Sequence, residues 1–263
     1  MLNRRAFLAI SGSLLAISCQ KPRAKTTQRL RFAVASDGHY GQPNTDYERY
    51  FKDIVTYLKL EKQTRGLDFV VFNGDLFHDK TEFMADVKRY FDLLGFPYFV
   101  TRGNHDHATA AQWQQTWGYG LNHTVVMGDN AILLADTSDE KGTYKCPDIA
   151  WIDAELSKLK DKSSVFLFMH IPYKKWSKEG VECLELEQVL AKYPNLKAGF
   201  HGHDHALDMA KIGEIPFLFD GHFGGSWGVN YKGYRIVESV VSNQWQTYQY
   251  DPATRTKINE NSL

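Results

Sequence analysis

Residues 67–75 read LDFVVFNGD, in which an apolar run leads straight into Gly74 and Asp75. The run from Leu67 to Phe72 is rich in β-branched and aromatic side chains and predicts a buried strand. In open α/β sheets, ligands bind outside the carboxyl ends of the strands, which is where Asp75 stands. This stretch therefore predicts an α/β fold and the sheet edge at which the chemistry takes place.

The same arrangement recurs at four other places in the chain, where an apolar run ends in polar or ionisable residues. These are RFAVAS before Asp37-Gly38-His39, FPYFVTR before Gly103-Asn104-His105-Asp106, VFLFM before His170, and LKAGF before His201-Gly202-His203-Asp204-His205. Helical patterns alternate with these runs, over residues 46–64, 81–94, 147–160 and 184–193. Strand patterns dominate after residue 207, and residues 29–263 are expected to form one domain in which all five clusters meet at one edge.

Composition narrows the classes of partner. The chain has 263 residues, of which 43% are hydrophobic, so it can bury a substantial core. Lys and Arg number 31, as do Asp and Glu, so there is no overall positive field to hold nucleic acid. Nucleic acid is therefore not expected as a partner.

The five clusters together offer a set of metal ligands without thiolate. Imidazole nitrogen with carboxylate or amide oxygen suits Zn, Mn or Fe rather than a cysteine-built structural zinc site. Seven such ligands are too many for one ion but suit two ions that share a carboxylate, an arrangement used for displacement at phosphorus. The candidate metal ligands are Asp37, His39, Asp75, Asn104, His170, His203 and His205.

The order DGH, GD, GNHD, H, GHDH resembles the calcineurin-like metallophosphoesterase superfamily, whose blocks are D-x-H, G-D, G-N-H-D/E, H and G-H-x-H. The resemblance covers residues 37 to 205 and implies a four-layer α/β/β/α sandwich. It also implies a dimetal-dependent hydrolase, either a phosphodiesterase or a phosphomonoesterase, whose partner is a small-molecule phosphoester substrate. Hydroxide between the two ions would be its nucleophile.

The resemblance also implies a role for each site residue. Asp37, His39 and His205 would hold the first ion, and Asn104, His170 and His203 the second, with Asp75 bridging the two. His105 would stabilise the transition state or protonate the leaving oxygen, and Asp106 would orient His105. His201 stands outside the G-H-x-H block and is expected to be dispensable for metal binding.

Other interpretations of single blocks remain open. DGH and GN could be ordinary turns, because glycine and asparagine tolerate positive φ, and His170 could be a core histidine. His222, in a glycine-rich stretch, and residues 173–176 are expected to belong to a tight turn and a solvated loop. A metal-binding or recognition lipoprotein that keeps the fold without catalysis is the alternative function.

The subgroup can be narrowed by comparison of single positions. Purple acid phosphatases have D-x-G in the first block and a tyrosine three residues after the bridging aspartate, where this chain has His39 and His78. GDLFHD, residues 74–79, resembles a block of DNA-repair exonucleases, but DNA as a substrate does not suit a chain that is expected to be exported and has no net positive charge. The HGHDH run is one residue short of the H-x-H-x-D-H signature of metallo-β-lactamase-fold hydrolases.

The first residues predict export. Arg4-Arg5 precede an apolar run from Ala6 to Ile17 that is too short to span a bilayer, which takes about 20 residues. The segment resembles a twin-arginine or an ordinary secretory signal, and Ser18-Cys19 resembles a lipoprotein cleavage site. Residues 1–28 are thus expected to be a signal peptide and a polar tether, with lipidation at Cys19 and a place in the bacterial envelope or periplasm.

An oxidising compartment would permit a disulfide between Cys146 and Cys183. Sequence spacing cannot place their Cα atoms within bridging distance, and two unpaired structural thiols are the expectation.

Overall fold

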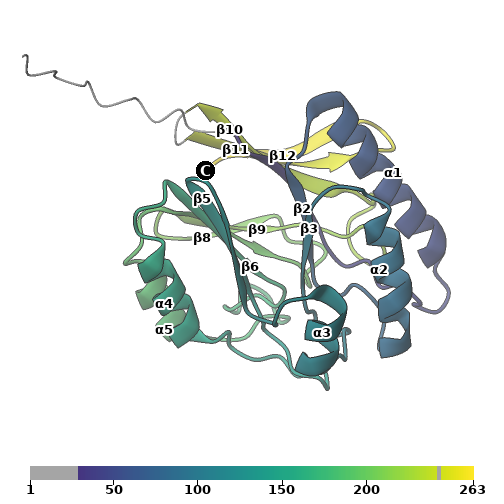
Figure 1. Cartoon of the computed structure of the whole chain (residues 1–263), viewed down its shortest axis with the longest axis horizontal. Coiled ribbons are helices and arrows are strands. Elements are labelled where there is room, and N and C mark those ends of the chain that lie inside the picture. Colours follow the sequence, from purple (N-terminus) through teal and green to yellow (C-terminus); the bar gives the residue numbers. More distant parts are fainter. Residues whose placement is uncertain (1–28, 242–243) are drawn as a thin grey trace, which may run out of the picture.

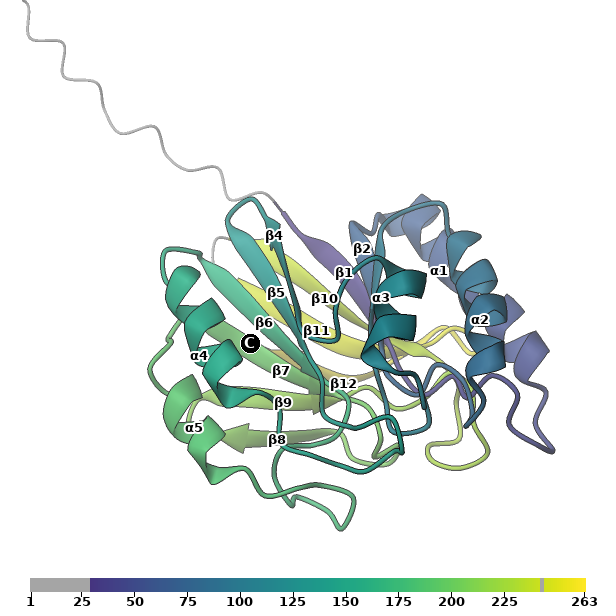
Figure 2. The same cartoon turned by 60° about the horizontal axis from the view of Figure 1, so that its bottom comes forward.

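The computed structural model describes residues 29–241 and 244–263. The described residues form two six-stranded sheets, with strand orders β12-β11-β10-β1-β2-β3 and β4-β5-β6-β7-β9-β8. Helices lie on the two outer sides, α1 and α2 on one side and α4 and α5 on the other (Figures 1 and 2). The predicted four-layer α/β/β/α sandwich is confirmed.

The first sheet combines three parallel strands from the first half of the chain with a C-terminal antiparallel meander. Its strands are β1 (Arg31–Ala35), β2 (Phe69–Asn73), β3 (Tyr98–Thr101), β10 (Tyr234–Val241), β11 (Gln244–Asp251) and β12 (Thr256–Ser262).

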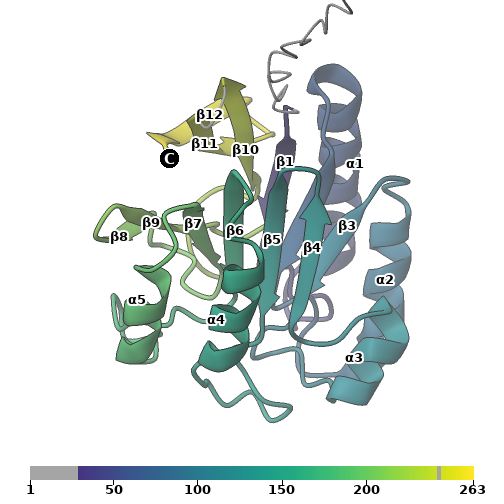
Figure 3. The same cartoon turned by 60° about the vertical axis from the view of Figure 1, so that its left-hand side comes forward.

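The second sheet has four parallel strands, β5, β6, β7 and β9, between two antiparallel edge strands (Figure 3). Its strands are β4 (His123–Met127), β5 (Asn130–Ala135), β6 (Ser164–Met169), β7 (Leu196–His201), β8 (Met209–Ile212) and β9 (Ile215–Phe219).

The helices cover the outer faces of both sheets through apolar stripes. Phe51, Ile54 and Leu58 of α1 are buried against the first sheet, as their helical spacing predicts. Asp46 caps α1 without a side-chain hydrogen bond. The helical segments are α1 (Tyr47–Arg65), the 3₁₀ turn η1 (Thr81–Phe83), α2 (Met84–Asp92), α3 (Ala110–Trp117), α4 (Ile149–Lys158) and α5 (Leu184–Leu190). None of these helices is both long and apolar enough to cross a membrane.

Between the sheets lies a core rich in aromatic side chains. Phe32 and Phe69 of the first sheet stack at 4.8 Å, and Phe32 meets Phe166 of the second sheet edge-on at 5.3 Å. Along each central strand, successive side chains point alternately into this inner core and toward the helices. Both faces of each sheet are therefore buried. This packing fixes where the parallel strands end, and hence where the loops of the site begin.

The expectation of two free thiols is wrong. Cys146 and Cys183 form a disulfide, with Cα atoms 5.8 Å apart across a sequence separation of 37. It joins the segment after β5 to the segment that precedes α5. The predicted signal peptide, tether and lipidation site at Cys19 lie outside the described residues.

The disulfide yields a stability prediction. Replacing both Cys146 and Cys183 by alanine should lower the free energy of unfolding by about 3 kcal/mol, because the open chain gains conformational entropy when unfolded. Urea unfolding of the wild type and the double variant, with and without reductant, measures the loss. Equal midpoints for the two proteins without reductant would contradict the assignment.

Candidate metal centre

The site lies where strands of both sheets end. Asp37 and His39 follow β1, Asp75 follows β2, and His170 follows β6. Backbone hydrogen bonds tie these loops together, since the amide of Asp37 donates to the Gly74 carbonyl (3.1 Å) and that of His39 to the Asp75 carbonyl (2.9 Å). The predicted convergence of the clusters at one edge is thus seen in the structure.

The turns that carry the ligands are backbone-strained. Asp37, His39, Asp75 and His203 all have left-handed φ angles, of 57°, 46°, 50° and 65°. Non-glycine residues adopt this region at a cost that the surrounding structure must offset, and such residues cluster at functional sites. The strain agrees with a role for these turns in aiming side chains.

Two glycines of the sequence blocks lie where two loops of the site pass so close together that there is no room for a side chain. A Cβ on Gly103 would collide with the Asp75 carboxylate and backbone, and one on Gly202 would collide with Ser36 and Asp37. The glycine of each block therefore lets one ligand loop pass over another.

The first cluster of ligand atoms comprises Asp37, His39 and His205, all buried, with the three atoms within 4.8 Å of one another. The Nε2 atom of His205 lies 2.8 Å from Asp37 Oδ1. Its Nδ1 lies 2.9 Å from the carbonyl oxygen of Trp227. Because a carbonyl oxygen can only accept a hydrogen bond, Nδ1 is the nitrogen that carries the proton and donates. That contact leaves Nε2 free to act as a ligand.

The second cluster comprises Asp75, His170 and His203, also buried and within 4.8 Å of one another. Asp75 Oδ2 lies 3.3 Å from His170 Nε2 and 3.7 Å from His39 Nε2 of the first cluster. Asp75 thus stands between the two clusters, where a bridging ligand is expected. His170 Nδ1 lies 2.7 Å from the carbonyl oxygen of Asn73, which directs Nε2 into the site.

Orphaned polar atoms test whether this donor set fits metal ions. Among the described residues, the buried Oδ1 of Asn104 and the buried Nε2 of His203 have no hydrogen-bond partner. Buried polar atoms in folded proteins are almost always paired, so each orphan requires an explanation. Two ions held by the predicted ligands would coordinate both atoms, and the residues present fit such ions.

The electrostatics of the site also favour cations. Burial lowers the pKa of His39 to about 3 and that of His203 to about 4, so both imidazoles are neutral, as ligation requires. Burial would raise the pKa of Asp75, but its histidine neighbours, His170 foremost, hold it well below the usual range. Burial likewise opposes a proton on His170, yet the carboxylates of Asp75 and Asp37 raise its pKa to about 10. In the metal-free protein, a proton on His170 therefore offsets the charge of the two carboxylates.

His105 lies beside the first cluster, its ring centroid 5.0 Å from that of His39. The backbone amide of His105 donates to Asp75 Oδ1 (2.8 Å), and its Nδ1 lies 2.7 Å from Asp79 Oδ1. Although burial lowers the pKa of His105, the Asp75 and Asp79 carboxylates raise it overall. A positioned imidazole whose pKa is raised by neighbouring carboxylates is suited to proton donation.

Asp106 does not orient His105, contrary to the expectation from the sequence. Its carboxylate accepts hydrogen bonds from the amides of Phe77 and Gly103, both at 2.9 Å. Asp106 therefore joins the loops that follow β2 and β3, and Asp79 takes the orienting contact to His105.

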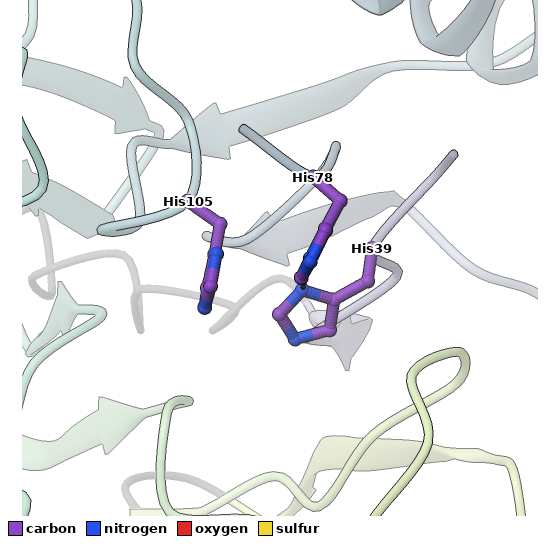
Figure 4. Close-up of side chains that lie close together, drawn as sticks. All are labelled: His39, His78 and His105. Atoms are coloured by element: carbon purple, nitrogen blue, oxygen red, sulfur yellow. Dashed lines mark hydrogen bonds between the residues drawn. The ribbon is translucent and has the colours of Figure 1, made fainter. Parts of the chain in front are cut away.

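Sequence reasoning also left His78 without a role. Its Nδ1 lies 3.3 Å from Nδ1 of His39, and its ring stacks on that of His105 at 4.5 Å. Figure 4 shows the parallel rings of His78 and His105 with His39 beside them. His78 and Asp79 stand three and four residues after Asp75, and the blocks of metal ligands do not include them.

The structure also shows the positions of His201, His222 and Trp176, for which the sequence predicted no metal ligation. His201 is buried outside both clusters, with Nδ1 3.0 Å from the carbonyl oxygen of Met169. His222 stacks on His205 at 4.9 Å, and its Nε2 lies 2.9 Å from the carbonyl oxygen of Val229, which holds the glycine-rich turn. Trp176 is half-buried against Phe217, so residues 173–176 are less solvated than expected.

Comparisons with known proteins give two relatives with partial coverage. A probable glycerophosphodiester phosphodiesterase GpdQ of Arcobacter nitrofigilis is 30% identical over 168 residues, 57% of this chain and 61% of the relative. The DNA double-strand break repair protein Mre11 of Halobacterium salinarum is 25% identical over 86% of this chain and 59% of its own length. The chain thus matches about 60% of the length of these two relatives.

Among solved structures, a dimetal phosphatase from Danio rerio superposes with a TM-score of 0.68 over 89% of this chain and 98% of that chain. At 12% identity, this likeness shows the shared fold. The family model for calcineurin-like phosphoesterases matches residues 30–207. Because that match covers well over half of its 263 residues, the chain belongs to the calcineurin-like phosphoesterase family.

Proposed function

We propose that this protein is a dimetal-dependent phosphoester hydrolase that acts on phosphodiesters. The observation that carries the proposal is the pair of buried ligand clusters, which approach each other where Asp75 Oδ2 of the second lies 3.7 Å from His39 Nε2 of the first. The buried Oδ1 of Asn104 and Nε2 of His203, which have no hydrogen-bond partner among the described residues, support it. The phosphodiesterase named among its relatives supports diesters as the substrate class. Mn, Fe and Zn all suit the nitrogen and oxygen donors.

The residues divide the work of the reaction. Two bound metal ions would supply an activated water and offset charge on the phosphoryl oxygens. His105 donates a proton to the leaving oxygen, and Asp79, 2.7 Å from its Nδ1, keeps the other ring nitrogen turned toward that oxygen. Asp106 and the strained turns hold the ligands in place, so that little reorganisation is needed at the moment of reaction.

The bound metal content should differ between variants of His203 and His201, two histidines of one short stretch. His203→Ala and Asp75→Asn should each lose bound metal and lower kcat/KM by more than about 100-fold, since even the outer partners of metal ligands are worth about 10- to 100-fold. His201→Ala, the matched control, should keep the metal content of the wild type. Elemental analysis of the folded proteins, with a panel of phosphate monoesters and diesters, gives both readouts. Two metal ions per chain without turnover would favour a metal-binding or recognition protein instead.

Proton donation by His105 should depend on the leaving group. His105→Ala should lower kcat by about 100-fold or more for an alkyl leaving group and much less for p-nitrophenolate, which leaves without a proton. Asp79→Asn should show the same pattern more weakly, and His123→Ala, in β4 and outside the ligand clusters, should show none. A series of diesters with graded leaving groups measures this slope. An equal loss for all leaving groups would assign His105 to binding rather than to proton transfer.

We also propose that the protein is exported and tethered to the envelope through Cys19. The disulfide supports this proposal, since disulfides persist in oxidising compartments. Mass spectrometry of the membrane fraction should find lipid on Cys19, and Cys19→Ser should release the protein into the soluble fraction. Full-length, unmodified protein in the cytoplasm would contradict export.

A further inference from the structure

A segment that we name the strap, residues 171–183, runs from β6 past the second cluster to α5. Its two arms pair, because the amide of Val181 donates to the Pro172 carbonyl (2.9 Å) and that of Cys183 to the Tyr173 carbonyl (3.0 Å). The disulfide to Cys146 ties its end to the segment that carries Tyr144. The strap is therefore held at both ends, and the side chains at its turn have defined positions.

The turn of the strap places a carboxylate beside the second cluster. Glu179 Oε2 lies 3.8 Å from Nε2 of His203, and the Glu179 side chain is 29% exposed. Its backbone amide donates to Ser177 Oγ (3.2 Å), and a Cβ at Gly180 would collide with the carbonyl of Lys174. Lys178 approaches the other carboxylate oxygen at 3.4 Å, but its side chain is 90% exposed and offsets little of the charge.

Tyr144 completes this side of the site. Its half-buried ring meets the ring of His203 edge-on at 4.7 Å. The amide of Lys145 donates to the Thr137 carbonyl (2.9 Å), which fixes the segment. Burial raises the pKa of Tyr144, and the charge of Glu179 adds to this effect, as expected of neighbours on one rim. A carboxylate and an aromatic ring thus lie beside the second cluster, whereas the imidazoles of His78 and His105 lie beside the first.

We infer that Glu179 and Tyr144 form a subsite for an ammonium-bearing substituent of a phosphodiester, and that Glu179 disfavours phosphate monoesters. The inference rests on the proposed phosphodiesterase function. A carboxylate attracts an ammonium group, and an aromatic face adds a cation–π contact. A phosphate monoester carries about −1.5 to −2 charge at neutral pH, whereas a diester carries only one negative charge, so the fixed carboxylate repels the monoester more strongly. His105 stands beside the first cluster, so the subsite receives the substituent that stays on phosphorus.

Three chromogenic substrates test the inference on the purified protein: p-nitrophenyl phosphocholine, p-nitrophenyl 3,3-dimethylbutyl phosphate, in which a neutral tert-butyl group replaces the trimethylammonium group, and p-nitrophenyl phosphate. Glu179→Gln should lower kcat/KM for the phosphocholine by about tenfold and raise it several-fold for the monoester. The rate for the dimethylbutyl diester, which has no ammonium group, should change less than about twofold. Tyr144→Leu should lower only the preference for the ammonium-bearing diester.

Glu182→Gln is the matched control, because Glu182 is an exposed carboxylate on the same strap. This variant should leave all three rates unchanged. Equal losses on both diesters in Glu179→Gln would overturn the inference, as would loss of bound metal, which would make Glu179 a metal ligand. Wild-type turnover of the dimethylbutyl diester establishes the phosphodiesterase function independently of Glu179. A wild type inert on all three substrates would overturn the function and the subsite with it.

Discussion

Two carboxylates, those of Asp37 and Asp75, are buried in one site with 0% and 1% exposure. Burial of two negative charges is very costly unless cations and hydrogen bonds compensate them. Here the compensation comes from a ring of histidines: against the effect of burial, the two carboxylates raise the pKa of His170 to about 10, and Asp37 raises that of His205. The ligand loops, their left-handed turns and the buried carboxylate of Asp106 are arranged around this concentration of charge.

Much of the fold and most of the metal centre follow from the sequence, because both depend on strand ends. An apolar run that stops at a polar cluster marks the strand and the site together, as Asp75 after β2 shows. The edge strands β4, β8 and β12 were not predicted, since they lack buried runs; β12, for example, is mostly exposed. Helix α3 was also missed, although the capping box of Thr109 and Gln112 was a readable signal.

The contacts that sequence could not supply are those made across loops. Asp106 bonds backbone amides rather than the neighbouring imidazole, and Asp79 reaches His105 from another strand end. The disulfide was missed for the same reason, because a separation of 37 residues says nothing of a Cα distance of 5.8 Å. Residue type and order predict which atoms bind metal, whereas their supports depend on how loops cross.

The strand order has a consequence for how this fold is completed. The family match ends at residue 207, yet β10 lies beside β1 in one sheet and β9 beside β7 in the other. Without residues 215–241, both β1 and β7 would present open edges of unpaired amides and carbonyls, which invite pairing with other chains. The amide of Gly224, which caps the Asp37 turn, would be missing as well. Residues 30–207 are therefore no independent folding unit. During synthesis, neither sheet is complete until β9 and β10 have been made, and until then its unpaired strand edges can aggregate with other chains.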